Sequence, residues 1–322
     1  MSTAKKIIWI DDNSGRKSTA DDIGAKFIDV NGKDLAQVVE DLLGGAQPSL
    51  IIVDHILDKI TSTNPMFQRG STVAEAIKEK WPACPVVGVT SADTVRTIDV
   101  RTKKTYDALF PFYRFGNYIG AIEAIERGFR AITKERQQNA RGLISFLKPP
   151  DDEVIRLADA LPEDLKKNFR DASIASRLYS WVERLMNRPG FLYDSLWAAT
   201  YLGLNEEGFQ KVVSTFHKAE YRGVFALDDD ARWWTSQLPN LLYKQVKPES
   251  GEMSWHAGRR LPGIKREHYS KCYVCRKDYP TTVAYLDVAS DERRAMHLEC
   301  TVLHPAFKRE LYFEDIRMMK GD

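Results

Sequence analysis

The feature that most constrains the fold is an alternation of short apolar runs with segments of helical periodicity in the first part of the chain. The apolar runs predict strands at Lys6–Ile10, Lys26–Val30, Leu50–Val53, Val86–Val89 and Ala108–Phe112. Helices are predicted at Gly15–Ile23, Lys33–Leu43, Ser71–Trp81, Asp93–Lys104 and Tyr118–Ile132. Strands that alternate with helices form a parallel sheet through right-handed crossovers, and continuous apolar runs favour burial on both faces. The pattern therefore predicts a doubly wound α/β domain.

Two breaks divide the rest of the chain. Pro149 and Pro150 end the helical pattern before them, because proline lacks the amide hydrogen that a helix needs. The segment Val246–Trp255 is rich in proline, glycine and serine. We therefore expect an α/β domain at residues 1–148, a mostly helical domain at 149–247, and a small zinc-binding α+β domain at 248–322.

Composition excludes several protein classes. The chain has 322 residues, 43% of them hydrophobic, which is enough to bury cores and excludes global disorder. Its net charge of +2 is too small for a protein that coats nucleic acid along its whole length. No apolar run approaches the ~20 residues of a membrane span, and the N-terminus carries no secretion signal. We therefore expect a cytoplasmic protein without a membrane partner.

Polar side chains follow the predicted strands where each strand ends. Asp11 and Asp12 follow the first apolar run, Asp54 follows the third, and Thr90 follows the fourth. The carboxyl ends of parallel strands line one crevice, so these side chains should meet. Clustered carboxylates need a hard cation such as Mg²⁺, and one of them can attack a phosphoryl group.

This pattern resembles the receiver domain of bacterial two-component response regulators, over about residues 4–135. The resemblance implies a flavodoxin-like sheet with strand order 2-1-3-4-5. It implies that Asp11, Asp12 and Asp54 bind Mg²⁺, that Asp54 is the phosphoacceptor, and that Thr90 holds a phosphoryl oxygen. It also implies a kinase partner, and a homodimer formed through the fourth and fifth helices.

Three positions depart from the receiver pattern. Receivers carry a lysine before a proline at the end of the fifth strand, where this chain has Phe110 and Pro111. Lys103 or Lys104 replaces it only if the fifth strand lies elsewhere. The segment Ile56–Gly70 is long, and the first helix is short and polar. Two interpretations stay open: a working phosphoacceptor, or a degenerate receiver whose strand-end aspartates only form caps and turns.

The cysteines and one histidine near the C-terminus have metal-ligand spacing. Cys272 and Cys275 form a C-x2-C pair, and His297 and Cys300 follow as H-x2-C. Strands predicted around Ser290 and Asp291 lie between the pairs, and a helix is expected to hold the second pair on one face. The order of knuckle, hairpin and helix resembles a treble-clef zinc finger, and three thiolates with one imidazole favour structural Zn²⁺.

Alternatives to this ligand set remain at the sequence level. His304 lies about one helical turn beyond Cys300 and is a second candidate ligand. Small buried thiols are the other interpretation, and Cys84 at the start of a core strand is expected to be such a thiol.

A basic stretch precedes the zinc ligands. Residues 255–277 interleave aromatic side chains with basic ones, and the nucleic-acid-binding candidates are Arg259, Arg260, Lys265, Arg266 and Lys271. Cations track phosphates, and aromatic rings stack on bases. The alternatives are a solvated surface or a patch that meets the middle segment, whose residues 149–250 carry a net charge of −3.

The middle segment resembles a winged helix. Helices are predicted at Leu192–Leu202 and Glu206–Phe216, and a hairpin at Tyr221–Leu227 and Ala231–Thr235. Asp228, Asp229 and Asp230 would form the wing tip, where they would repel phosphates. This charge favours protein contact over DNA contact.

No enzymatic motif emerges beyond phosphoryl acceptance. The sequence contains no glycine-rich phosphate loop and no nucleophile elbow. We therefore expect a regulatory signalling or adaptor protein, not an enzyme, that acts through protein partners. The alternative is a regulator that binds nucleic acid through residues 255–277 and the zinc finger.

Overall fold

The computed structural model describes residues 6–58, 60, 69–135, 137–187, 190–247, 249, 251–278, 282–287, 292–297 and 300. The chain divides into two compact units. Unit 1 comprises residues 1–143 and 161–181, and unit 2 comprises 144–160 and 182–322. The predicted limits at 148 and 247 are not the limits of these units, because 161–181 joins unit 1 and the last two predicted domains share unit 2.

A parallel sheet forms the centre of unit 1. Its strands are β1 (Ile7–Asp11), β2 (Ala25–Asp29), β3 (Leu50–Asp54), β4 (Val86–Thr90) and β5 (Ala108–Pro111). They lie in the order β2-β1-β3-β4-β5, with every neighbouring pair parallel. This is the flavodoxin-like order, so the predicted fold class is confirmed.

Burial follows position in the sheet. Every residue of β1, β3 and β4 is buried, whereas most residues of the edge strands β2 and β5 are only partly buried. The central strands are apolar almost throughout because helices cover both of their faces. Their polar residues Asp11, Asp54 and Thr90 are the last residue of each strand, where the sheet gives way to loops.

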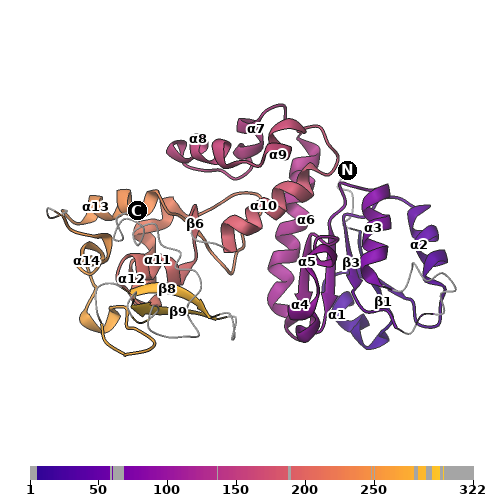
Figure 1. Cartoon of the computed structure of the whole chain (residues 1–322), viewed down its shortest axis with the longest axis horizontal. Helices are drawn as coiled ribbons and strands as arrows, with labels where there is room; N and C mark the ends of the chain where they lie inside the picture. Colours follow the sequence, from indigo (N-terminus) through magenta and orange to yellow (C-terminus); the bar gives the residue numbers. More distant parts are fainter. Residues whose placement is uncertain are drawn as a thin grey trace. The chain divides into compact units, whose positions relative to one another are not determined.

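Helices cover both faces of the sheet (Figure 1). They are η1 (Ser14–Arg16), α1 (Lys17–Asp22), α2 (Leu35–Leu43), α3 (Gly70–Lys80), α4 (Ala92–Thr97), α5 (Val100–Lys103), η2 (Phe112–Tyr118) and α6 (Ile119–Lys134). The predicted helix at 93–104 is divided in two, because the Asp99 carboxylate accepts hydrogen bonds from the backbone of Arg101 and Thr102 and starts α5 anew.

Glycine is required where α3 begins. The amide of Gly70 donates to the carbonyl of His55 at 3.0 Å. A Cβ atom on Gly70 would lie 2.0 Å from the carbonyl oxygen of Asp54. The start of α3 therefore packs directly on the end of β3, and no larger residue fits without moving one of them.

The second part of the chain is mostly helical. Its helices are α7 (Ala140–Ser145), α8 (Asp151–Ala160), α9 (Glu163–Lys167), α10 (Ile174–Asn187), α11 (Ser195–Tyr201), α12 (Glu206–Val212), η3 (Val213–Ala219), α13 (Gln237–Gln245), α14 (Ser254–Gly258) and η4 (Arg266–His268). Its strands are β6 (Leu192–Tyr193), β7 (Trp233–Trp234), β8 (Thr282–Asp287) and β9 (Glu292–His297). Among the described helices, none is both long and apolar enough to cross a bilayer.

Two predictions in the middle segment were wrong in detail. Leu192 and Tyr193 form a strand, and the helix starts only at Ser195, because Asp194 caps it by accepting from the amide of Trp197 at 2.7 Å. The predicted hairpin is reduced to its base, where Glu220 and Trp233 form an isolated antiparallel bridge and the amide of Tyr221 donates to the carbonyl of Arg232 at 2.7 Å. Within 221–235, only β7 is a strand, and it pairs antiparallel with β6.

One core joins the middle and C-terminal segments of unit 2. The buried side chains of Trp197, Phe209 and Leu242 belong to the same cluster as Val283 and Ala284 of β8. The predicted hairpin of β8 and β9 is present and antiparallel, and β8 packs on α11 through this cluster. Strand β8, which lies between the two ligand pairs, is therefore part of the core of unit 2, whereas Cys272 and Met296 form a separate small cluster.

Candidate functional site

The predicted carboxylates meet at the carboxyl edge of the sheet. Asp11 ends β1, Asp12 follows it, and Asp54 ends β3, the neighbouring strand. All three are buried, and one oxygen of each lies within 4.8 Å of the others. The sheet therefore assembles the acidic cluster that the sequence predicts.

Asp11 is fixed by hydrogen bonds from three directions. The indole of Trp9 donates to its Oδ2 at 3.0 Å, and the amide of Asn13 donates to its Oδ1 at 2.8 Å. The guanidinium of Arg16 also donates to Oδ2, at 2.9 Å. Asp11 is thus held rigidly at the end of β1.

Arg16 is the functional residue that sequence reasoning missed. Its Nη1 lies 2.9 Å from Asp11 Oδ2 and 3.0 Å from Asp54 Oδ2. Its guanidinium carbon lies 4.4 Å from the centroid of the Phe112 ring. Although burial opposes the charged form, Asp54 and Asp11 raise the pKa of Arg16. A basic residue shortly after the acidic pair was the available signal.

Asp54 is buried, and both a carboxylate and a guanidinium lie next to its side chain. Burial and the carboxylate of Asp11 raise the pKa of Asp54 to about 7, and Arg16 acts in the opposite direction. Its Oδ1 is buried and has no hydrogen-bond partner among the described residues, whereas Oδ2 contacts Arg16. One oxygen of Asp54 is therefore available for a ligand or for attack on one.

The donor set fits a divalent cation by its chemistry. Carboxylate oxygens are the ligands that Mg²⁺ prefers, and Asp54 Oδ1 offers one that nothing described engages. The oxygens of Asp11 and Asp54 that face Arg16 are, however, already neutralised by its guanidinium. Either the guanidinium of Arg16 or a divalent cation can therefore neutralise carboxylates of this cluster.

Thr90 lies on the neighbouring strand, as predicted. It ends β4, and its residue pair in β5 is Pro111. Its hydroxyl is buried, without a hydrogen-bond partner among the described residues. A buried hydroxyl in this position can donate to an anion bound at the carboxyl edge of the sheet.

The fifth strand lies where the sequence predicts it. Phe110 belongs to β5 and stacks on Tyr118 with ring centroids 4.5 Å apart. Lys103 ends α5, and Lys104 is its C-cap, so neither lysine belongs to the strand. The position at which receivers carry lysine is therefore aromatic in this chain.

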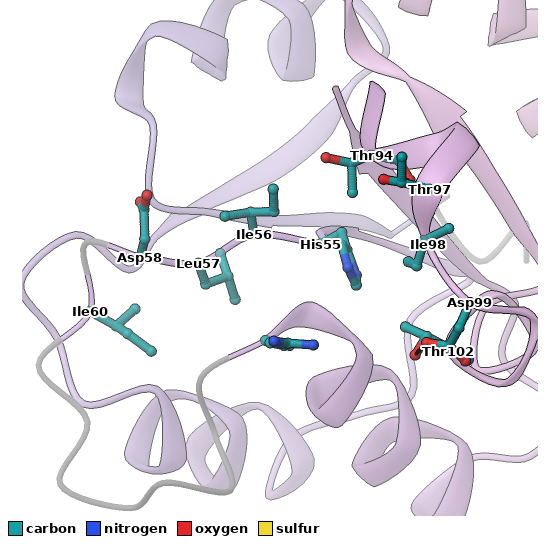
Figure 2. Close-up of a pocket in the computed structure, with 11 residues that line it drawn as sticks. His55, Ile56, Leu57, Asp58, Ile60, Thr94, Thr97, Ile98, Asp99 and Thr102 are labelled. Carbon is teal, nitrogen blue, oxygen red and sulfur yellow. Dashed lines mark hydrogen bonds between the residues drawn. The ribbon is translucent and has the colours of Figure 1, made fainter. Parts of the chain in front are cut away.

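A cavity of about 710 Å³ lies beside β3 (Figure 2). Its lining comes from the stretch after Asp54, including His55 and Arg69, and from α4 and α5. The Nδ1 atom of His55 lies 3.0 Å from the hydroxyl of Tyr106, and burial together with Arg69 lowers the pKa of His55. His55 is therefore neutral at neutral pH and connects the cavity lining to the core.

The predicted zinc ligands also meet, in unit 2. One ligand atom from each of Cys272, Cys275, His297 and Cys300 lies within 4.8 Å of the others. The Sγ atom of Cys275 lies 3.2 Å from His297 Nδ1, and that of Cys300 lies 3.9 Å from the same nitrogen. Three sulfurs and one imidazole at this spacing fit a tetrahedral zinc ion.

The first ligand pair lies on a tight knuckle. The amide of Cys272 donates to the carbonyl of Lys277 at 3.0 Å, and the amide of Arg276 donates back to Cys272 at 2.9 Å. Arg276 has a φ of 63°, which lets the chain reverse after Cys275. The knuckle is joined to β9 by a hydrogen bond from the amide of Tyr273 to the carbonyl of Ala295 at 2.8 Å.

The second ligand pair does not share a helix face, which corrects the sequence prediction. His297 is the last residue of β9 and pairs with Thr282 of β8, so only Cys300 is helical. Strand pairing extends to the ligand because Met296 beside it is buried against Cys272. His304, the alternative ligand, lies outside the described residues.

The pKa values of two thiols in this cluster are shifted in opposite directions. Burial raises the pKa of Cys272, but backbone amides, those of Cys275 and His297 foremost, reverse this and lower it overall. Burial and the other two thiols raise the pKa of Cys300. Adjacent thiolates repel one another, so a cation is needed to hold all of them deprotonated. Burial also raises the pKa of Cys84, to about 12, which fits the predicted inert thiol.

Two of the nucleic-acid-binding candidates make contacts within unit 2. Arg259 donates to the carbonyl of Gly203 at 3.2 Å, and its guanidinium lies 4.5 Å from the ring centroid of Tyr269. Arg260 forms a close ion pair with Glu252. Both side chains thus help to hold the segment before the zinc ligands in place.

The other candidates are more exposed. Arg266 is 85% exposed along its side chain and pairs with Asp278 at 3.2 Å. Lys265 and Lys271 are exposed, as is the ring of Tyr273. The cations available to an external phosphate are therefore these lysines rather than the arginines at 259 and 260.

Comparisons with known proteins found structural likeness only. No family model matches the chain, and no curated protein matches its sequence. The response regulator TrrA from Thermotoga maritima, solved with Mg²⁺ and BeF, is 16% identical with a TM-score of 0.27 over 35% of this chain and 91% of that chain. The isolated REC domain of RcsB from Salmonella enterica is 14% identical with a TM-score of 0.28, over 38% and 89%.

A full-length regulator is also similar. FixJ from B. japonicum is 13% identical with a TM-score of 0.30, over 57% of this chain and all (100%) of that chain. At these identities and scores, the fold assignment rests on the strand order of the chain's own sheet.

Proposed function

We propose that this chain is a regulatory signalling protein, not an enzyme, that receives its signal at Asp54 and passes it on through protein contacts of unit 2. The observation that supports this proposal is the buried cluster of Asp11, Asp12 and Asp54 at the carboxyl edge of a sheet with order β2-β1-β3-β4-β5. In this proposal, the chain's partners are the kinase and the output protein that the sequence analysis expects.

The chemistry of the input is phosphoryl transfer to a carboxylate. An oxygen of Asp54 forms a bond to phosphorus as the bond between phosphorus and the donor's leaving group breaks. The Oδ1 atom is available, and the Thr90 hydroxyl can donate to an oxygen of the transferred group. A Mg²⁺ ion held by the carboxylates would supply positive charge to that group.

Mass spectrometry tests the input. The full chain is incubated with acetyl phosphate and Mg²⁺, and its intact mass is compared with that of Asp54→Asn and Asp58→Asn. We expect one phosphoryl group on the wild-type chain and on Asp58→Asn, which alters an exposed neighbouring aspartate, and none on Asp54→Asn. An unchanged wild-type mass would show that Asp54 is not a phosphoacceptor for this donor.

Unit 2 is proposed as the output, with one zinc ion held by Cys272, Cys275, His297 and Cys300. The ligand spacing supports a closed, structural site, which leaves no coordination position for a substrate. The exposed acidic stretch Asp228–Asp230 supports contact with a protein rather than with a phosphate backbone.

Nucleic-acid binding is the second candidate function. The exposed side chains of Lys265 and Lys271 favour it, because cations suit phosphates. The Tyr273 ring lies beside them, with the guanidinium carbons of Arg294 and Arg276 at 3.9 and 5.0 Å from its centroid. Fluorescence anisotropy with single-stranded DNA and RNA tests it. Binding that weakens steeply with salt and is lost in Lys265→Glu/Lys271→Glu, but not in Lys33→Glu, would support this function.

A further inference from the structure

The guanidinium of Arg16 is the cation that contacts the acidic cluster in this structure. Arg16 follows β1 by five residues and places one nitrogen, Nη1, 2.9 Å from Asp11 Oδ2 and 3.0 Å from Asp54 Oδ2. Both carboxylates are buried, and like charges this close repel strongly away from water. Arg16 therefore supplies positive charge that offsets the repulsion between these two carboxylates.

A divalent cation at the proposed input site would compete for the same oxygen atoms. If Asp54 Oδ1 is kept for the phosphoryl group, the cation must be bound through Asp54 Oδ2, which Arg16 already contacts. Mg²⁺ binds carboxylate oxygens at ~2.0–2.1 Å, so an ion ligated by Asp11 Oδ2 and Asp54 Oδ2 would lie where Arg16 Nη1 now approaches them. Two cations cannot share that position. Binding of one to these oxygens therefore requires the other to leave.

Hydrogen bonds within the loop after β1 hold Arg16 in position. The side chain of Asn13 accepts from the amide of Gly15 at 3.1 Å, and the carbonyl of Asn13 accepts from the amide of Arg16 at 3.0 Å. The Phe112 ring lies 4.4 Å from the guanidinium carbon, and the Arg16 side chain is only 16% exposed. Contacts on several sides thus favour the bound position of Arg16.

We propose that Arg16 determines the cation specificity of this site: it is the resident counter-ion of Asp11 and Asp54, and a divalent cation binds only when Arg16 is displaced. This inference rests on the proposed function, since it concerns the same input site. Metal affinity is then reduced by the fraction of molecules in which Arg16 has left the carboxylates. If Arg16 is displaced in about a tenth of molecules, affinity falls about tenfold.

Metal titration of the full chain tests the inference. Mn²⁺ binding is measured from the loss of the free-ion EPR signal, and Mg²⁺ affinity from its competition with Mn²⁺. We expect Arg16→Gln to bind Mn²⁺ at least about tenfold more tightly than the wild type. Lys17→Gln, which removes the exposed neighbouring cation, should bind like the wild type. Equal affinities of wild type and Arg16→Gln would overturn the proposal.

A second variant, Arg16→Lys, keeps the proposal testable if Arg16→Gln does not fold. Arg16→Lys keeps a positive charge but offers a point charge without the planar fork of arginine. Its Mn²⁺ affinity should lie between those of the wild type and Arg16→Gln, and an affinity equal to the wild type in a folded Arg16→Lys protein would contradict the proposal.

The metal readout is independent of phosphorylation. A chain that shows competition between Arg16 and Mn²⁺ but gains no phosphoryl group would overturn the proposed input and leave this inference intact. A chain that gains a phosphoryl group while Arg16→Gln and the wild type bind Mn²⁺ equally would do the reverse.

Discussion

The guanidinium of Arg16 lies 3.0 Å from the carboxylate of Asp54, although the two residues come from different βα units of the chain. The same guanidinium also lies over the ring of Phe112, at the start of η2. Three separate segments therefore meet at one cation, and a change in any of them should alter how firmly Arg16 is held.

Phe112→Leu should loosen Arg16 without touching a carboxylate. A desolvated cation–π contact contributes about 1–2 kcal/mol, so its loss should tighten Mn²⁺ binding several-fold as Arg16 leaves more readily. Tyr113→Leu is the matched control, because the neighbouring ring is 61% exposed. The EPR titration reads both variants, and an unchanged affinity in Phe112→Leu would show that the ring does not restrain Arg16.

Gly70→Ala should disturb the end of β3. The added Cβ would lie 2.0 Å from the carbonyl oxygen of Asp54, and such overpacking typically costs about 1–3 kcal/mol. Hydrogen–deuterium exchange should therefore rise in peptides that cover β3 and α3. Gly44→Ala is the control, since its new Cβ would lie 3.5 Å from the carbonyl oxygen of Glu40, which is an ordinary van der Waals contact. Equal exchange in both variants would argue against the close contact.

The sheet and its acidic edge could be predicted because both depend on local pattern. Apolar runs of strand length identify β1, β3 and β4, and the residue that ends or follows each run must lie at the carboxyl edge of a parallel sheet. That rule alone brings Asp11, Asp54 and Thr90 together. The zinc ligands could be predicted for a similar reason, since their spacing limits how far apart they can lie.

Arg16 could not be predicted in this way. Its role depends on the rotamer of a long side chain and on Phe112, which only the folded sheet brings near. The assignment of His297 to a helix was wrong because three-residue spacing suits a helix, but pairing with Thr282 extends β9 through that position. Tertiary contacts thus override local spacing at both sites.

Cys272→Ser should remove the zinc ion. The wild-type chain is expected to carry about one zinc ion, held by four ligands, and loss of a buried thiolate ligand should release it. Elemental analysis of purified protein gives the metal content, and exchange of β8 and β9 amides reports the loss of structure. Cys84→Ser, which changes the buried cysteine of unit 1, should keep its zinc. A zinc-free wild-type chain with a protected hairpin would refute the site.

Arg293→Ala should loosen the hairpin from α11. Arg293 pairs with Asp194, the N-cap of α11, and its guanidinium lies 4.3 Å from the ring centroid of Trp197. Breaking this partly buried contact should cost about 1–3 kcal/mol, because Asp194 loses a charged partner. Lys211→Ala removes an exposed helix pair with Glu207 and should cost only about 0.3–0.5 kcal/mol. Thermal unfolding followed by circular dichroism separates the two, and equal melting temperatures would contradict the expected coupling.

Glu183→Gln should stabilise the protein at alkaline pH. Burial raises the pKa of Glu183, with Arg184 acting in the opposite direction, so the folded state disfavours the ionised form. The stability that this protonated group contributes is present below its unfolded pKa and is lost as pH rises through the higher folded pKa. Because the amide cannot ionise, the variant should unfold at a higher urea concentration than the wild type at pH ~8, and this difference should shrink towards zero near pH ~4. Urea unfolding at several pH values measures this difference in midpoint. A difference of the same size at pH ~8 and pH ~4 would contradict the prediction, because it would come from packing of the amide and not from ionisation of Glu183.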